Sequence, residues 1–76
     1  MLKLAVLGAS GRMGRTLLRC IAAAGDPDLA GAVTEPADPA LGRDAGESAG
    51  LERCGVMLTA DRAAALRHAD AAIDFT

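Results

Sequence analysis

The sequence has almost no aromatic side chains. It contains neither Trp nor Tyr, and Phe75 is its only Phe, so any core must be built from aliphatic residues. Cysteine is also scarce, with Cys20 and Cys54 as the only two. These two cysteines fit no CxxC or metal-ligand spacing, so we expect reduced thiols and no metal site.

Long apolar runs and a strong excess of one charge are missing as well. The apolar run Leu4 to Leu7 breaks at Gly8 and is too short for a signal peptide or a membrane span. Eight basic and ten acidic residues leave a net charge of −2, whereas nucleic acids select basic surfaces. We therefore expect a soluble, cytoplasmic chain that binds neither membranes nor nucleic acid.

What the sequence does contain is enough aliphatic residues for one small domain of 76 residues. Residues 2–7 are aliphatic and end at a glycine, as a buried strand does. A helical pattern begins at Gly11, and Gly25 followed by Pro27 should end it. Three arginines occupy one side of this helix, and the side expected to face the core carries Met13, Leu17, Leu18, Cys20, Ile21 and Ala24.

The remaining residues continue the alternation of strands and helices. Residues 29–34 predict a second strand, so the first half of the chain reads as a strand–helix–strand unit with parallel strands. Residues 36–54 predict a long loop with one helical turn, because Asp44 and Glu47 have the spacing of a capping box.

The last third of the chain predicts two more strands, over 55–59 and 71–75. Between them, Asp61 should cap a short helix over 62–69, with Ala65, Leu66 and Ala69 packed inward. The alternation predicts an open parallel α/β sheet in the strand order 3-2-1-4. Such a sheet needs helices on both faces and neighbours at its edges, but no helix follows the fourth predicted strand in this sequence. We therefore expect these residues to be the front half of a dinucleotide-binding domain.

The stretch GASGRMG, residues 8–14, lies between the first strand and the first helix. Glycines there allow backbone N–H groups to approach a pyrophosphate, which the dipole at the helix N-terminus also favours. Gly8 would permit the tight turn, Gly11 the close approach, and Gly14 the packing of helix on strand. The spacing is GxxGxxG, with Ala9 and Ser10 between the first two glycines. Such a pattern alone is weak evidence for dinucleotide binding, but its position after a predicted strand and at the start of a predicted helix strengthens it.

Two further residues strengthen this interpretation. Arg12 lies in the first turn of the helix, where a cation opposes the helix dipole unless an anion binds, so we expect Arg12 to contact phosphate. Met13 is expected in the core of the helix, with cofactor contact as a second role. Glu35 lies at the end of the second strand, where dinucleotide-binding folds place an acid that binds the adenosine ribose hydroxyls.

Three segments together resemble one enzyme family. GASGRMGRTL at 8–17, LGRDAGESAG at 41–50 and AAIDFT at 71–76 are similar to 4-hydroxy-tetrahydrodipicolinate reductase, also called dihydrodipicolinate reductase. The resemblance implies the N-terminal part of a two-domain, homotetrameric enzyme with a Rossmann-type fold. That family transfers hydride from NADH or NADPH to 4-hydroxy-tetrahydrodipicolinate, giving tetrahydrodipicolinate in lysine and diaminopimelate biosynthesis.

The resemblance also assigns residues. It implies that the turn from Gly8 to Met13, including Ala9, Ser10, Gly11 and Arg12, wraps the pyrophosphate. Glu35 would bind the adenosine ribose, and Asp74, Phe75 and Thr76 would lie beside the nicotinamide half of the cofactor. The family's catalytic residues and its substrate-binding, tetramer-forming domain match nothing in residues 1–76, so no catalytic residue is assigned here. His68 is expected to be a helix-end residue only, and the segment 44–50 receives no functional role.

The residues leave two other functions open. A glycine turn followed by a strand-end acid also suits a non-enzymatic module that senses NAD(H) or binds another nucleotide. Another reductase of the same fold, acting on an acyl phosphate, is a third possibility. For the reductase we expect NADH to be preferred, because Pro36 follows Glu35 where an arginine for the 2′-phosphate of NADPH would stand. Arg43 is the cation that could fold back and supply the missing charge.

Overall fold

The computed structural model describes residues 2–25 and 28–76. Four strands form one sheet in the order β3-β2-β1-β4, and every pairing is parallel. The strands are β1 (Lys3–Leu7), β2 (Asp28–Val33), β3 (Leu58–Thr59) and β4 (Ala71–Asp74). Both the parallel sheet and its predicted strand order are confirmed.

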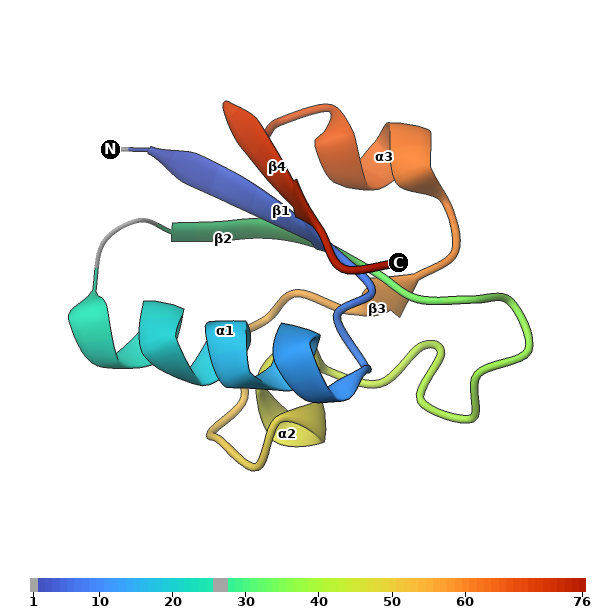
Figure 1. Ribbon diagram of the computed structural model, residues 1–76, viewed down its shortest axis with the longest axis horizontal. Coiled ribbons are helices and arrows are strands. Elements are labelled where there is room, and N and C mark those ends of the chain that lie inside the picture. The colour runs from blue at the N-terminus through green and yellow to red at the C-terminus, as the bar shows by residue number, and fades with distance from the viewer. Residues whose placement is uncertain (1, 26–27) are drawn as a thin grey trace.

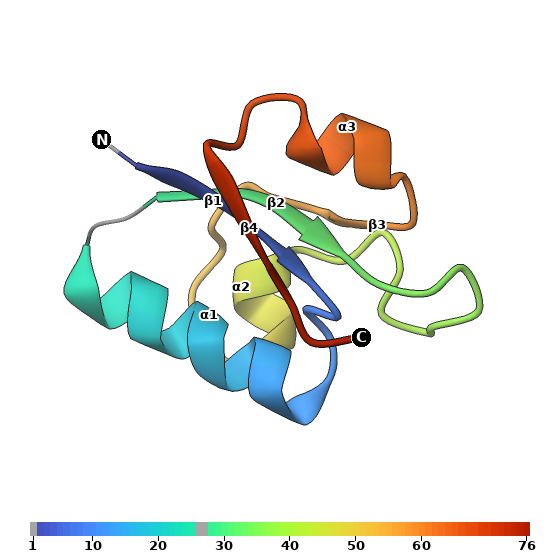
Figure 2. The same cartoon turned by 45° about the horizontal axis from the view of Figure 1, so that its top comes forward.

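Helices cover both faces of this sheet. The long helix α1 (Arg12–Ala24) and the short helix α2 (Ala45–Ser48) lie on one face, and α3 (Arg62–Leu66) lies on the other (Figures 1 and 2). Because the chain crosses from β1 to β2 through α1 and from β3 to β4 through α3, the sheet is doubly wound. The fold is therefore a Rossmann-type α/β fold.

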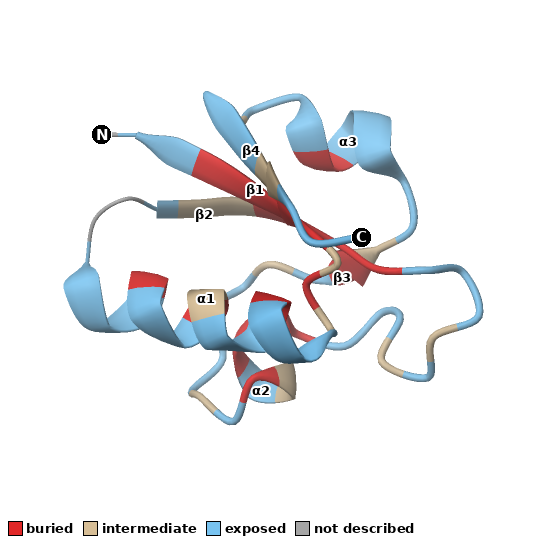
Figure 3. Ribbon diagram, viewed as in Figure 1, coloured by how far each residue is buried: buried red, intermediate tan, exposed pale blue. Residues whose placement is uncertain are grey.

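The core lies along β1, whose residues from Leu4 to Leu7 are buried, as Figure 3 shows. Side chains alternate between the two faces, as the pleat of a strand requires. Leu4 and Val6 pack with α1 and α2, whereas Leu7 joins Ala65 of α3 on the other face. A Cβ on Gly31 of β2 would collide with the backbone of Ala65, so α3 sits directly on that strand.

The buried face of α1 differs from the prediction. Gly14, Leu18 and Ile21 are buried, whereas Met13 is 59% exposed; Cys20 and Ala24 are exposed too. The cause is Gly14, on which a Cβ would collide with the Gly8 carbonyl oxygen and the Ala9 backbone. This contact turns the helix so that positions 14, 18 and 21 face the sheet, about 100° from Met13.

The ends of the elements also depart from the prediction in places. Gly25 caps α1 with a left-handed φ of 75°, as expected, while Pro27 lies outside the described residues. The third strand covers only Leu58–Thr59, because Met57 forms an isolated antiparallel bridge with Asp44 instead. Helix α3 ends at Leu66, and Leu66 itself is 39% exposed rather than packed inward.

Candidate functional site

The glycine turn between β1 and α1 lies at the carboxyl edge of the sheet. Gly8 adopts a φ of +80°, a conformation that favours glycine. Its N–H and that of Ala9 both donate to the Val33 carbonyl at 2.9 Å, and the Gly11 N–H donates to the Gly8 carbonyl at 3.2 Å. These bonds tie the turn to the end of β2.

Other N–H groups of this turn have no acceptor. Within the described residues, the backbone N–H groups of Ser10, Arg12 and Met13 donate to no protein acceptor. Gly11 caps α1 without a side-chain hydrogen bond, and the first turn holds no acidic residue. The positive end of the helix dipole is therefore uncompensated, which makes this turn suited to bind an anion.

A groove of about 660 Å³ runs past the turn. It collects residues from four separate segments, namely the glycine turn and the stretches of chain that follow β2, β3 and β4. Its lining includes Gly8, Ser10, Gly11, Thr34, Glu35, Asp38, Arg62, Phe75 and Thr76. Six of the nine predicted site residues therefore meet at one groove: Gly8, Ser10, Gly11, Glu35, Phe75 and Thr76.

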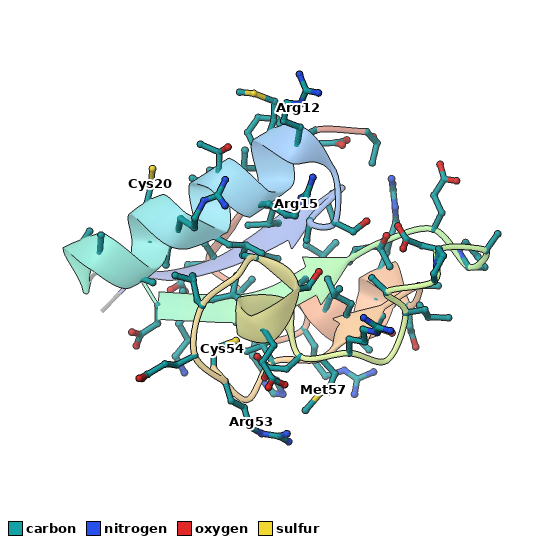
Figure 4. The ribbon with its side chains drawn as sticks, turned by 90° about the horizontal axis from the view of Figure 1, so that it is seen from below. Arg12, Arg15, Cys20, Arg53, Cys54 and Met57 are labelled. Carbon is teal, nitrogen blue, oxygen red and sulfur yellow. The ribbon has the colours of Figure 1, made fainter. Side chains whose placement is uncertain are left out.

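The other three predicted residues lie beside this groove. Ala9 is fully buried and its N–H is already bonded, so it holds the turn in place. Arg12 and Met13 are exposed on the first turn of α1, and Figure 4 shows the Arg12 side chain projecting away from the sheet. Arg12 and Met13 therefore contribute unbonded backbone N–H groups to the turn, but their side chains do not line the groove.

The end of β4 closes the groove on the other side. The Phe75 N–H donates to the Leu7 carbonyl at 2.9 Å, and a Cβ on Gly8 would lie 3.1 Å from the Phe75 carbonyl carbon. Asp74 accepts hydrogen bonds from the Thr76 N–H and hydroxyl. These bonds, with a weaker effect of the Arg62 charge, lower the pKa of Asp74 below its usual value.

Sequence reasoning missed one cluster of side chains in the groove. The Asp38 carboxylate accepts hydrogen bonds from the Ser10 hydroxyl at 2.6 Å and from the Thr34 hydroxyl at 2.9 Å. The Ser10 bond, the Ala40 N–H and the Thr34 bond together lower the pKa of Asp38. A usable signal was present: Pro36 and Pro39 occupy the second positions of two overlapping turns that bring the chain back.

The segment 44–50 has a structural explanation. Asp44 is 3% exposed, and its carboxylate accepts the N–H groups of Glu47 at 3.1 Å, Cys54 at 3.0 Å and Gly55 at 2.8 Å. It thus caps α2, as its spacing predicted, and also fastens the loop that comes after this helix. These bonds, above all that from Cys54, lower the Asp44 pKa to about 2 although burial opposes the shift.

Several other groups show no link to this site. Cys20 and Cys54 are free and exposed, and Figure 4 shows them on different elements. His68 lies in the turn after α3 and is exposed. Within residues 2–25 and 28–76, no cluster of His, Cys, Asp or Glu could hold a metal ion, and no helix is long and apolar enough to cross a membrane.

A larger cavity, of about 820 Å³, lies near the amino ends of β1 and β2. Leu18, Leu51 and Cys54 contribute to its lining, together with other residues of α1 and the loop after α2. Ligands of open α/β sheets bind at the carboxyl ends of the strands, and this cavity lacks the unbonded N–H groups of the glycine turn. The smaller groove is therefore the better candidate site.

Comparison with known proteins decides the family. Residues 2–76 match the family model described as "Dihydrodipicolinate reductase, N-terminus". The chain belongs to the dihydrodipicolinate reductase family. The matching family model describes the N-terminal part of these reductases. The glycine turn and the doubly wound sheet of this chain both lie within the matched residues.

Individual relatives agree with the family match. A 4-hydroxy-tetrahydrodipicolinate reductase from Rhizobium meliloti is 47% identical over 75 residues, which is 99% of this chain and 31% of the relative. The reductase from Cupriavidus pinatubonensis is 49% identical over 75 residues, and that from Nitrosomonas eutropha 46% over 76. The chain spans 28% of the length of each of these two.

Proposed function

We propose that this chain is the cofactor-binding part of a 4-hydroxy-tetrahydrodipicolinate reductase. The enzyme would transfer hydride from NAD(P)H to 4-hydroxy-tetrahydrodipicolinate and give tetrahydrodipicolinate, a step of lysine and diaminopimelate biosynthesis. One observation carries the proposal: the glycine turn, whose N–H groups at Ser10, Arg12 and Met13 are unbonded, borders one groove together with the segments that follow β2 and β4. The relatives are named as 4-hydroxy-tetrahydrodipicolinate reductases, which supports the reductase activity; the hydride donor, the product and the pathway are part of the proposal.

The pyrophosphate of the cofactor would lie on the glycine turn. The N–H groups of Ser10, Arg12 and Met13 are available as donors, and the helix dipole adds a favourable field. A Cβ on Gly11 would meet only the Gly8 carbonyl, at 3.4 Å, so the space in front of Gly11 is open. The Arg12 guanidinium, on the same helical turn, would reach the phosphates by a change of rotamer.

The two ends of the cofactor would extend along the groove in opposite directions. Glu35 and Asp38, after β2, are the carboxylates available to the adenosine ribose. Phe75 and Thr76, after β4, would lie beside the nicotinamide, which supplies the hydride when the cofactor is bound. The Phe75 side chain is 39% exposed, so it presents an apolar surface to a planar ring without movement of the backbone.

We further propose that substrate binding, catalysis and assembly into a cytoplasmic homotetramer depend on residues other than these 76. No residue of the groove is assigned a catalytic role. Binding and activity are therefore best measured on a full-length reductase, meaning a protein of the relatives' length that carries this sequence as its N-terminal part.

The proposal includes a preference for NADH. Two carboxylates, Glu35 and Asp38, line the adenosine side of the groove, and the 2′-phosphate of NADPH would meet both of them charge to charge. Arg43 does not line the groove, whereas Arg62 does, so Arg62 is the cation that could offset this repulsion. We expect NADH to bind roughly tenfold more tightly than NADPH, or better.

Two measurements on the full-length reductase test the proposal. Calorimetric titration with NADH and with NADPH should show saturable binding of both, with the tighter dissociation constant for NADH. Purified enzyme should also oxidise NADH when the product of the preceding synthase is supplied. Absence of binding by both cofactors would refute the assignment, and equal or tighter binding of NADPH would refute the preference alone.

A further inference from the structure

Asp38 is held in the groove by neighbours on three sides. The Asp38 N–H donates to the Glu35 carbonyl at 3.0 Å, which closes a turn with Pro36 at its second position. This turn brings the Asp38 carboxylate back to the end of β2, where it meets the hydroxyls of Ser10 and Thr34. Asp38 thus joins the glycine turn to the strand end, although it lies several residues beyond that strand.

The hydrogen bonds of this carboxylate leave one acceptor position for a ligand. The hydroxyl oxygens of Ser10 and Thr34 lie 2.6 and 2.9 Å from Oδ2 and contact each other at 2.5 Å, whereas Oδ1 accepts only from the Ala40 N–H, at 2.8 Å. An ionised carboxylate offers about four acceptor positions, so one remains, on Oδ1. The same bonds lower the Asp38 pKa and keep the group ionised at neutral pH.

Glu35 lacks the hydrogen bonds that fix Asp38 in place. Its side chain is exposed, and no described residue donates a hydrogen bond to it. A free glutamate loses rotamer entropy when it is fixed on a ligand. Asp38 is already fixed in place, so binding a donor there costs less.

Resting on the function proposed above, we propose that Asp38, rather than Glu35, receives the 2′-hydroxyl of the adenosine ribose and is the residue that discriminates against NADPH. The ribose is joined directly to the pyrophosphate through its 5′ carbon, so its partner must lie next to the pyrophosphate-binding turn. Asp38 meets this condition, because its carboxylate is bonded to Ser10 of that turn. A 2′-phosphate brings no hydroxyl proton and adds a like charge at the same point.

The test compares two carboxylates in the same groove. Asp38→Asn and Glu35→Gln each remove one negative charge with little change of shape, and each variant of the full-length reductase is titrated with NADH and NADPH. We expect Asp38→Asn to weaken NADH binding about tenfold, as for a lost hydrogen bond to a charged group. NADPH binding should be unchanged or tighter, so the NADH-to-NADPH affinity ratio falls by about tenfold or more. Glu35→Gln removes an exposed charge that no hydrogen bond fixes in place, so it should lower this ratio clearly less than Asp38→Asn does.

Further variants separate charge from structure. Asp38→Glu keeps the negative charge and should still disfavour NADPH. If Asp38→Asn does not fold, Asp38→Ser removes the charge but keeps a short polar side chain in the turn, and it should lower the ratio in the same way.

Two outcomes would overturn the assignment of Asp38. A ratio that shifts in Glu35→Gln and not in Asp38→Asn would assign the ribose to Glu35. Equal weakening of both cofactors in Asp38→Asn would make the cluster purely structural. In either case the cofactor-binding function would stand, whereas wild-type protein that binds neither cofactor would refute that function itself.

Discussion

At the scale of single residues, Asp44 contributes to the fold rather than to the groove. Its carboxylate takes three backbone N–H groups from two segments, the start of α2 and the loop at Cys54 and Gly55. Asp44 is thereby the structural centre of the segment 44–50, for which the sequence suggested no function. The sequence predicted the cap through its spacing, but the partners ten and eleven residues away depend on the path of the loop.

Loss of the Asp44 charge should destabilise the protein in a pH-dependent way. The Asp44 pKa is lowered from 3.8 to about 2 in the folded state. Its stabilisation is therefore fully present above pH 3.8 and is lost as the pH falls toward 2. Asp44→Ala removes the cap and leaves donors without a partner, so we expect the midpoint of thermal unfolding at pH 7 to fall by roughly 5–10 °C.

Thermal unfolding followed by circular dichroism from about pH 7 to about pH 2 measures both effects. The difference between wild type and Asp44→Ala should narrow below about pH 4, as the wild-type carboxylate becomes protonated. Asp61→Ala is a matched control, because Asp61 caps α3 through the Ala64 N–H alone and should give a smaller decrease. A difference for Asp44→Ala that stays constant across this pH range would contradict the role given to its charge.

At the scale of elements, the glycine turn and α1 act as one unit. Gly14 docks the helix on the turn, and the turn is bonded to Val33 at the end of β2. The prediction from sequence placed the turn, the helix and its glycine cap correctly. It placed Met13 on the wrong face because it followed apolar side chains, while the closest contact is made by a glycine that has none.

Substitution of Gly11 should separate binding from folding. Gly11 has a φ of −73° in the extended region and open space beyond its Cα, so Gly11→Val should still fold, with only a modest decrease in the unfolding midpoint because valine is a poorer helix N-cap than glycine. The valine side chain would stand where the pyrophosphate binds, and we expect NADH binding to be lost. Arg12→Ala should weaken binding by about 1–2 kcal/mol if the guanidinium reaches the phosphates. Unchanged calorimetric affinity in both variants would contradict the placement of the cofactor on this turn.

At the scale of the whole molecule, the strand order and parallel direction were predictable because the βαβ pattern admits few topologies. The sequence also predicted part of the groove, because the carboxyl ends of parallel strands lie at one edge of the sheet and bring the segments after them together. The cluster at Asp38 was not predicted, because two proline turns set its position and no periodic pattern reports them. The third strand was predicted over 55–59 but covers only Leu58–Thr59, since Asp44 holds the Gly55 N–H and Met57 pairs with Asp44 outside the sheet.

The function proposed for this molecule requires a nicotinamide dinucleotide to bind on the glycine turn. The most direct measurement is a titration of the ¹⁵N-labelled full-length reductase with NADH, observed residue by residue in ¹H–¹⁵N correlation spectra. We predict saturable shifts that are largest at the N–H groups of Ser10, Arg12 and Met13, because these are the unbonded donors of the glycine turn. Saturable shifts around Leu18 and Leu51 in the larger cavity, with the glycine turn unchanged, would contradict this binding mode.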